Sequence, residues 1–181
     1  MSDLRESGPA GDEVGMSIVE VIIYSALTAL VLSVLGGLFF VGFQTQAAAS
    51  GRDAATGAAQ VVSNSVQTTV RNASSISVSG TLLKARVASG AAGWRCVAWA
   101  LTADSKLVYK SSSAAITSTD YSTWTVLAIE ASGRLGGGAA FSGNSSEVSY
   151  SLAFTSGSVT VPVAGAATAN AYGTGSPESC W

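Results

Sequence analysis

The strongest constraint on this 181-residue chain is a stretch without charged side chains that lies between Glu20 and Arg52. Its apolar part, from Val21 to Phe43, is 23 residues long. As a helix this part would measure about 34 Å, enough to cross a hydrocarbon core of about 30 Å. A secretory signal has a basic leader and an apolar run of only about 7 to 15 residues. The run therefore predicts one membrane-spanning helix, not a signal peptide.

A helical pattern continues past Phe43, where the composition becomes more polar. Apolar residues recur in steps of three and four, which places them on one helix face; they are Ala55, Ala59, Val62, Val66, Val70 and Ala73. Other faces carry Gln60, Asn64, Gln67 and Arg71. The sequence predicts an amphipathic helix over residues 44–74, and Gly51 and Gly57 allow a bend or break between Ala49 and Gly57.

After Asn72 the apolar period changes from helical to alternating, which is typical of half-buried strands. Strands are predicted around Ile76 to Val78, Leu83 to Val87, Cys96 to Thr102, Lys106 to Lys110, Trp124 to Glu130, Glu147 to Phe154 and Ser158 to Val163. Pro162 marks the last strand as an edge. Gly133 to Gly138 is predicted to be a flexible loop, and Ala164 to Pro177 a poorly structured tail. The expected fold is α+β, with the amphipathic helix packed on an antiparallel sheet formed by residues 75–181.

The composition argues against catalysis and against metal or nucleic-acid binding. The chain has no histidine, so the usual general base and most transition-metal ligands are absent. The carboxylates Asp104, Asp120, Glu130 and Glu147 are scattered, and each fits a turn or a strand end. Residues 1–15 carry a net charge of −3 and the remainder +1, and this near-neutral remainder argues against strong electrostatic steering to nucleic acid. We expect no enzyme activity, no cofactor and no small-molecule substrate.

The sequence Gly15-Met16-Ser17-Ile18-Val19-Glu20, placed before the apolar run, resembles the processing site of type IV prepilins and pseudopilins. Two positions depart from the usual form. Asp12-Glu13-Val14 precedes the glycine, where a Lys or Arg is common, and Met16 follows it, where Phe is common. The resemblance implies cleavage after Gly15 by a prepilin peptidase, N-methylation of Met16, and a role in assembly for Glu20.

The resemblance also implies an organisation and a function. Residues 1–15 would be a cytoplasmic leader, 16–43 a transmembrane and assembly helix, 44–74 its amphipathic continuation, and 75–181 an extracytoplasmic globular domain of pilin-like fold. The chain would be a minor pilin or pseudopilin of a type IV pilus, competence or type II secretion-like filament. It would occupy the cytoplasmic (inner) membrane as a single-pass protein before assembly, and contact other pilin subunits through its N-terminal helix.

Several alternatives stay open. Glu20 could merely complement the positive end of the helix dipole. The chain could be a single-pass anchored binding module, or a secreted protein cut after Ala47-Ala48-Ala49. Gly36-Gly37 and Gly42 fit either helix packing or a soft point in the helix.

Cys96 and Cys180, in the segment expected outside the cytoplasm, predict one disulfide that closes a loop of about 84 residues. The alternative is two unpaired thiols. The aromatic residues Trp94, Trp99, Trp124 and Tyr109 are expected in the core rather than on a ligand platform. Four cations, Lys84, Arg86, Lys106 and Lys110, could form a basic patch if their strands were neighbours, or else a solvated face.

Overall fold

A computed structural model describes residue 15 and residues 17–89, 93–173 and 180–181. The chain separates into two compact units, Met1–Thr45 and Gln46–Trp181, and one helix contributes to both. The predicted leader up to Val14 and the predicted mature N-terminus, Met16, lie outside the described residues. Gly15 is described and is exposed.

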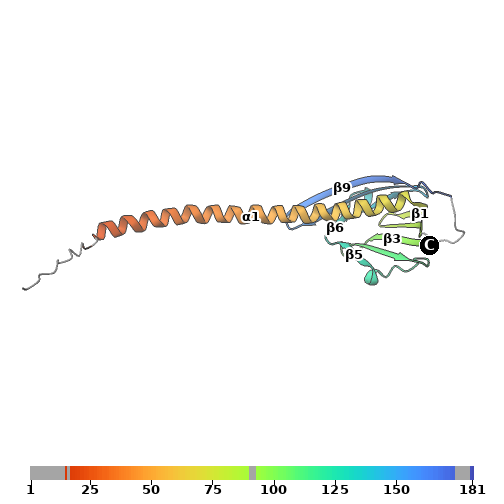
Figure 1. The fold of residues 1–181 in the computed structure, drawn as a ribbon, viewed down its shortest axis with the longest axis horizontal. Coiled ribbons are helices and arrows are strands. Elements are labelled where there is room, and N and C mark those ends of the chain that lie inside the picture. Colours follow the sequence, from red (N-terminus) through yellow and green to blue (C-terminus); the bar gives the residue numbers. More distant parts are fainter. Residues whose placement is uncertain (1–14, 16, 90–92, 174–179) are drawn as a thin grey trace, which may run out of the picture. The chain divides into compact units, whose positions relative to one another are not determined.

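Helix α1 runs without interruption from Ile18 to Arg71 (Figure 1). A break between Ala49 and Gly57, which the sequence allowed, is therefore absent. Each glycine costs a helix about 1 kcal/mol relative to alanine. The high helix propensity of the surrounding alanine-rich turns outweighs this cost. Gly51 has a different reason to be there. A Cβ atom added to it would lie 2.7 Å from the carbonyl oxygen of Ser156, so glycine permits this close approach.

The first sheet has five antiparallel strands in the order β1-β2-β3-β4-β5. They are β1 Ala73–Ser79, β2 Leu82–Ala88, β3 Trp94–Leu101, β4 Leu107–Ser112 and β5 Thr125–Ala128. Each strand pairs with its sequence neighbour, and their positions agree with the predicted alternation. A short 3-10 helix, η2 (Tyr121–Thr123), precedes β5.

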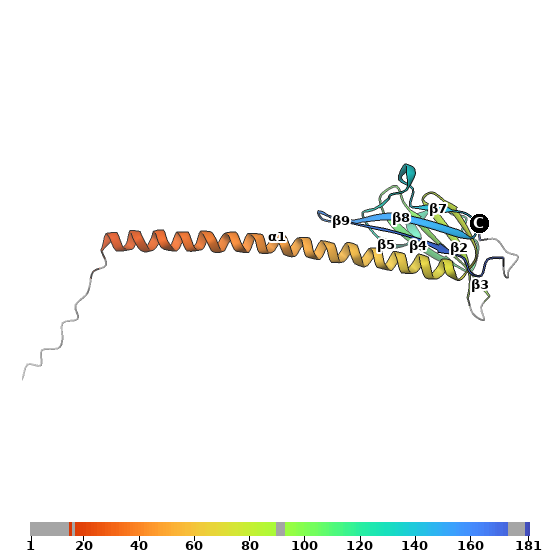
Figure 2. The same ribbon diagram turned by 90° about the horizontal axis from the view of Figure 1, so that it is seen from above.

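The second sheet is built on the long strand β8 and was not predicted as a separate sheet. It contains β6 Ala131–Gly133, β7 Phe141–Gly143, β8 Glu147–Ser156 and β9 Val159–Thr168 (Figure 2). Strands β6 and β7 pair with one side of β8 and β9 with the other. Both missed strands have only three residues, too few to show an alternating pattern.

One of the predicted irregular segments and the beginning of another have regular structure. Gly133 ends β6, and Gly136–Gly138 form a 3-10 turn, η3, inside a bridge between Leu135 and Ala139. Strand β9 continues to Thr168, four residues past the predicted start of the tail at Ala164. The edge position of this strand is confirmed, because in the described chain β9 pairs only with β8.

The buried face of α1 is the predicted one as far as Val70, but the helix ends at Arg71, and Ala73, also expected on this face, begins β1 instead. Ala55, Ala59, Val62, Val66 and Val70 are all buried, in one core with residues of both sheets. Polar groups inside this core are paired. The Tyr150 hydroxyl lies 2.7 Å from Ser63 Oγ and accepts from Gln67 Nε2 at 2.8 Å. Gln67, expected on another face, thus reaches the core.

A second, smaller core lies on the other face of the first sheet. It joins Cys96, Ala98, Ala100 and Val108 of the strands to Ile116, Trp124 and Cys180. The predicted disulfide between Cys96 and Cys180 is present, with a Cα–Cα distance of 5.5 Å. The Ile116 N–H also donates to the Cys180 carbonyl at 3.0 Å, so the C-terminal residues are held to the globular unit at two points.

Candidate assembly helix and its carboxylate

The predicted site begins where α1 begins. The first turn closes with a hydrogen bond of 3.1 Å from the Val21 N–H to the Ser17 carbonyl. Glu20 is exposed in this turn, where the positive end of the helix dipole favours a carboxylate. Gly15, three residues before Ile18, has no heavy atom within 4 Å of the place where a side chain would start. Met16 lies outside the described residues, so its distance from Glu20 is not part of this geometry.

The surface of α1 from Ile18 to Phe43 is apolar on every face. Its exposed large side chains are Ile18, Val19, Val21, Ile22, Ile23, Tyr24, Leu27, Leu30, Val31, Leu32, Val34, Leu35, Leu38, Phe39, Phe40, Val41 and Phe43. Every residue of α1 as far as Ser50 is exposed. The helix is long and apolar enough to cross a membrane.

Three hydroxyl groups in the first part of the helix donate to carbonyl groups of the same helix. Ser25 Oγ donates to the Ile22 carbonyl, Thr28 Oγ1 to the Tyr24 carbonyl, and Thr45 Oγ1 to the Val41 carbonyl, at 2.8 to 2.9 Å. Such bonds hide polar groups from a nonpolar solvent. Glu20 is the one ionisable carboxylate of this apolar surface, and nothing in the described helix neutralises it.

The other carboxylates of the described residues have local structural roles or lie on the surface. Asp104 pairs with Lys106, and bonds from Lys106 and then Thr102 lower the pKa of Asp104 to about 2. Asp120 caps η2, and its pKa is lowered by bonds from the side chain and then the backbone N–H of Ser122. The described residues contain no cluster of three metal-binding side chains.

The four predicted cations do not form one patch, because β3 lies between β2 and β4. Lys84 Nζ donates to the Ile116 carbonyl at 2.7 Å, and Arg86 Nε donates to Ser74 Oγ at 2.9 Å. Lys110 lies over the Trp124 ring and Lys106 pairs with Asp104. The other reading, a solvated face, holds in part, because all four side chains are partly exposed and each also has a partner within the chain.

The aromatic residues are mostly core, as predicted. Trp99 and Trp124 are buried, whereas Tyr109 and Trp94 are half-buried. Trp99 packs against Tyr109 with ring centroids 5.7 Å apart, and its Nε1–H donates to Ser65 Oγ of α1 at 3.2 Å. Trp94 lies under the Arg86 guanidinium.

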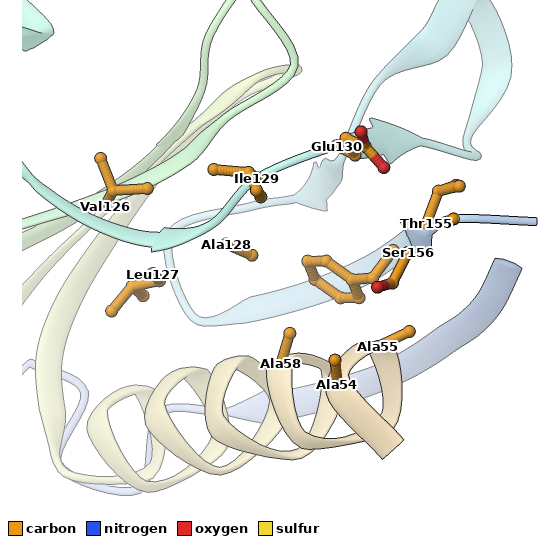
Figure 3. A pocket seen from close by; sticks show the side chains of 12 residues that line it. Ala54, Ala55, Ala58, Val126, Leu127, Ala128, Ile129, Glu130, Thr155 and Ser156 are labelled. Carbon is orange, nitrogen blue, oxygen red and sulfur yellow. The ribbon is translucent and has the colours of Figure 1, made fainter. Parts of the chain in front are cut away.

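An apolar groove in the globular unit, shown in Figure 3, was not predicted from the sequence. It has a volume of about 430 Å³ and lies between α1, β5 with the two residues after it, and the turn that joins β8 to β9. Ala54 and Ala58 line the helix side, and Val126 to Glu130 line the strand side. Glu130 is its one charged lining residue. The groove joins residues more than 70 positions apart, which no local pattern reveals.

No protein-family model, curated protein or solved structure matches this chain.

Proposed function

We propose that the chain is a structural subunit of a type IV pilus, competence or type II secretion-like filament, as a minor pilin or pseudopilin. It is processed after Gly15 by a prepilin peptidase and assembled through α1. The observation that carries the proposal is the division of one continuous helix into two surfaces. Ile18–Phe43 exposes mostly apolar side chains, with Glu20 as the one charged group among them, whereas the part after Gly51 buries one face in a folded unit.

The exposed part requires an apolar surrounding, because this much uncovered hydrophobic surface is not stable in water. A bilayer supplies it before assembly, and a bundle of equivalent helices supplies it afterwards. The change from lipid to helix bundle leaves the apolar contacts nearly unchanged. It is therefore accessible without unfolding the globular unit.

Glu20 gives this exchange its specificity. A carboxylate in lipid costs about 2.5 to 3.5 kcal/mol on insertion scales, so it favours a docked state in which a cation neutralises it. Cleavage after Gly15 creates a cation of this kind, the α-amine of Met16, on every processed copy. The Met16 amine of one copy pairs with Glu20 of its neighbour, which makes docking dependent on processing.

N-terminal sequencing of the protein recovered from the membrane and from sheared filaments tests the proposal. The filament subunit begins at Met16, with a methylated amine. An uncut chain in the membrane would instead indicate an anchored binding module. A start at Ser50 would indicate secretion after Ala49, which lies inside the continuous helix.

A further inference from the structure

The groove beside β5 is an uncovered apolar surface of the folded unit. Val126 and Ile129 on its strand side are 50% and 64% exposed, and Ala54 and Ala58 form its helix side. In the described chain β5 pairs only with β4, so its outer edge has unpaired backbone groups. Contiguous apolar surface at an open strand edge is typical of a protein interaction site.

A single acidic side chain stands at the rim of this groove. Figure 3 shows Glu130 across the hollow from the helix alanines. Its backbone has a left-handed φ of 53°, unfavourable for a residue with a side chain. Two hydrogen bonds fix it there: the Thr155 N–H donates to the Glu130 carbonyl at 3.0 Å, and the Ala131 N–H donates to the Ser105 carbonyl at 2.8 Å.

Residues held in such sparsely populated backbone conformations cluster at functional sites. Among the described residues, none donates a hydrogen bond or forms an ion pair with the Glu130 carboxylate. The groove thus matches an occupant that has a small apolar surface and one cation beside it.

We infer that this occupant is a second copy of the chain, packed side by side, with Arg52 of one copy paired with Glu130 of the other. Arg52 is exposed, follows the small exposed residues Ala47 to Ser50, and has no described partner. Other cations near apolar surface are already engaged, since Lys84 bonds to Ile116 and Lys110 lies over Trp124.

The position of Arg52 along the helix axis also favours a second copy of the chain as the occupant of the groove. Arg52 precedes Ala54 by two residues, a rise of about 3 Å. Copies anchored in one membrane point in the same direction, so groups at the same height meet when two copies pack laterally. Here the inference rests on the proposed function, which supplies the common orientation. It adds a contact between globular units to the contact between N-terminal helices.

Charge exchange tests the pair. The full chain is labelled with donor and acceptor dyes, and its self-association in detergent is measured by energy transfer. Glu130→Arg and Arg52→Glu should each weaken association about fivefold, the effect expected of one ion pair at a partly covered interface. The double exchange should restore association to within about twofold of the original chain, because the pair is re-formed with reversed signs.

Matched controls use exposed charges outside the groove. Glu147→Arg and Arg95→Glu alter the net charge equally and should leave association unchanged. Ile129→Ser should weaken association through the apolar contact alone. Formation of the Cys96–Cys180 bridge on a non-reducing gel shows that each variant is folded.

A double exchange no better than its single parents would overturn the inference, as would equal losses in the control variants. If only the apolar helix mediated self-association, all charge variants would associate as strongly as the original chain. That result would also overturn the inference. These results would not bear on cleavage after Gly15 or on filament formation, which are measured separately. An uncut chain whose association still follows the charge exchange would remove the filament function and retain the contact.

Discussion

At the scale of single residues, the proposed function predicts that a change at Glu20 separates membrane residence from assembly. Replacing it with alanine removes a charge from the head of an apolar helix, so Glu20→Ala should insert into membranes at least as well as the original chain. Its amount in sheared filaments should fall at least tenfold, because the Met16 amine of a neighbour loses its partner. Immunoblots of the membrane and filament fractions measure both quantities.

The control for this change is Glu20→Asp, which keeps the charge and should retain part of the assembly. Cleavage after Gly15 should continue in both variants and is read from the size of the mature chain. Normal recovery of Glu20→Ala in filaments would remove the assembly role. Loss of cleavage would instead place Glu20 in recognition by the peptidase.

Asp104 offers a residue-scale test of the globular unit. Its pKa is lowered to about 2, chiefly by the hydrogen bond from Lys106. A carboxyl group whose folded pKa is below its unfolded value stabilises the fold above the unfolded pKa of about 3.9 and loses this effect as pH falls toward 2. Lys106→Ala should raise the pKa of Asp104 toward its usual value, measured by NMR titration of its side-chain carboxyl.

The Lys106→Ala variant should also show less loss of stability between pH 4 and pH 2 than the original chain. Because both side chains are largely in contact with solvent, we expect the difference to be small. An unchanged pKa of Asp104 would show that Thr102 and the local backbone dominate. Thr102→Val separates these contributions.

At the scale of elements, two glycines in one helix have opposite expected effects. Gly57→Ala meets open space and should stabilise the chain by about 0.5 to 1 kcal/mol through helix propensity. Gly51→Ala forces the Ser156 carbonyl away, so it should destabilise by about 1 to 3 kcal/mol despite the same gain in propensity. Urea unfolding of the full chain in detergent measures both.

The comparison is internally controlled, since the helix, the substitution and the measurement are the same. Equal shifts in the two variants would contradict the close approach of α1 to the β8–β9 turn. A Gly51→Ala variant of original stability would show that this turn moves at little cost.

Elements whose residues repeat with a regular period were predictable from the sequence. The buried stripe from Ala55 to Val70 follows from steps of three and four, and the strands of the first sheet follow from alternation. The continuity of α1 at Gly51 was not predictable, because the role of that glycine depends on Ser156, over 100 residues later.

The second sheet and the groove were missed for a related physical reason. β6 and β7 are three residues long and take their stability from the ten-residue strand β8. The groove forms where the chain crosses from the first sheet to the second, between Ala128 and Ala131. Glu130, in this crossing, has a left-handed backbone conformation. Local sequence patterns show the spacing of apolar residues along the chain. They do not show where such a crossing places the edge of a sheet.

At the scale of the whole molecule, the Cys96–Cys180 bridge couples the end of the chain to the second core. The bridge spans 84 residues and should stabilise the fold by about 4 kcal/mol on the loop-entropy account. It also brings Cys180 to the Ile116 N–H, next to Trp124. Reduction should therefore loosen this core before the larger core, which shares neither cysteine.

Two measurements on the full chain check this order. Cys96→Ser and Cys180→Ser should lower the free energy of unfolding by similar amounts, about 2 to 5 kcal/mol, because either change removes the same bridge. In mild reductant, Trp124 should become accessible to a fluorescence quencher while Trp99, in the larger core, stays protected; Trp124→Phe assigns the signal. Simultaneous exposure of both tryptophans would show that the two cores unfold as one unit. An unfolding midpoint unaffected by reductant would show that packing alone holds the C-terminal residues.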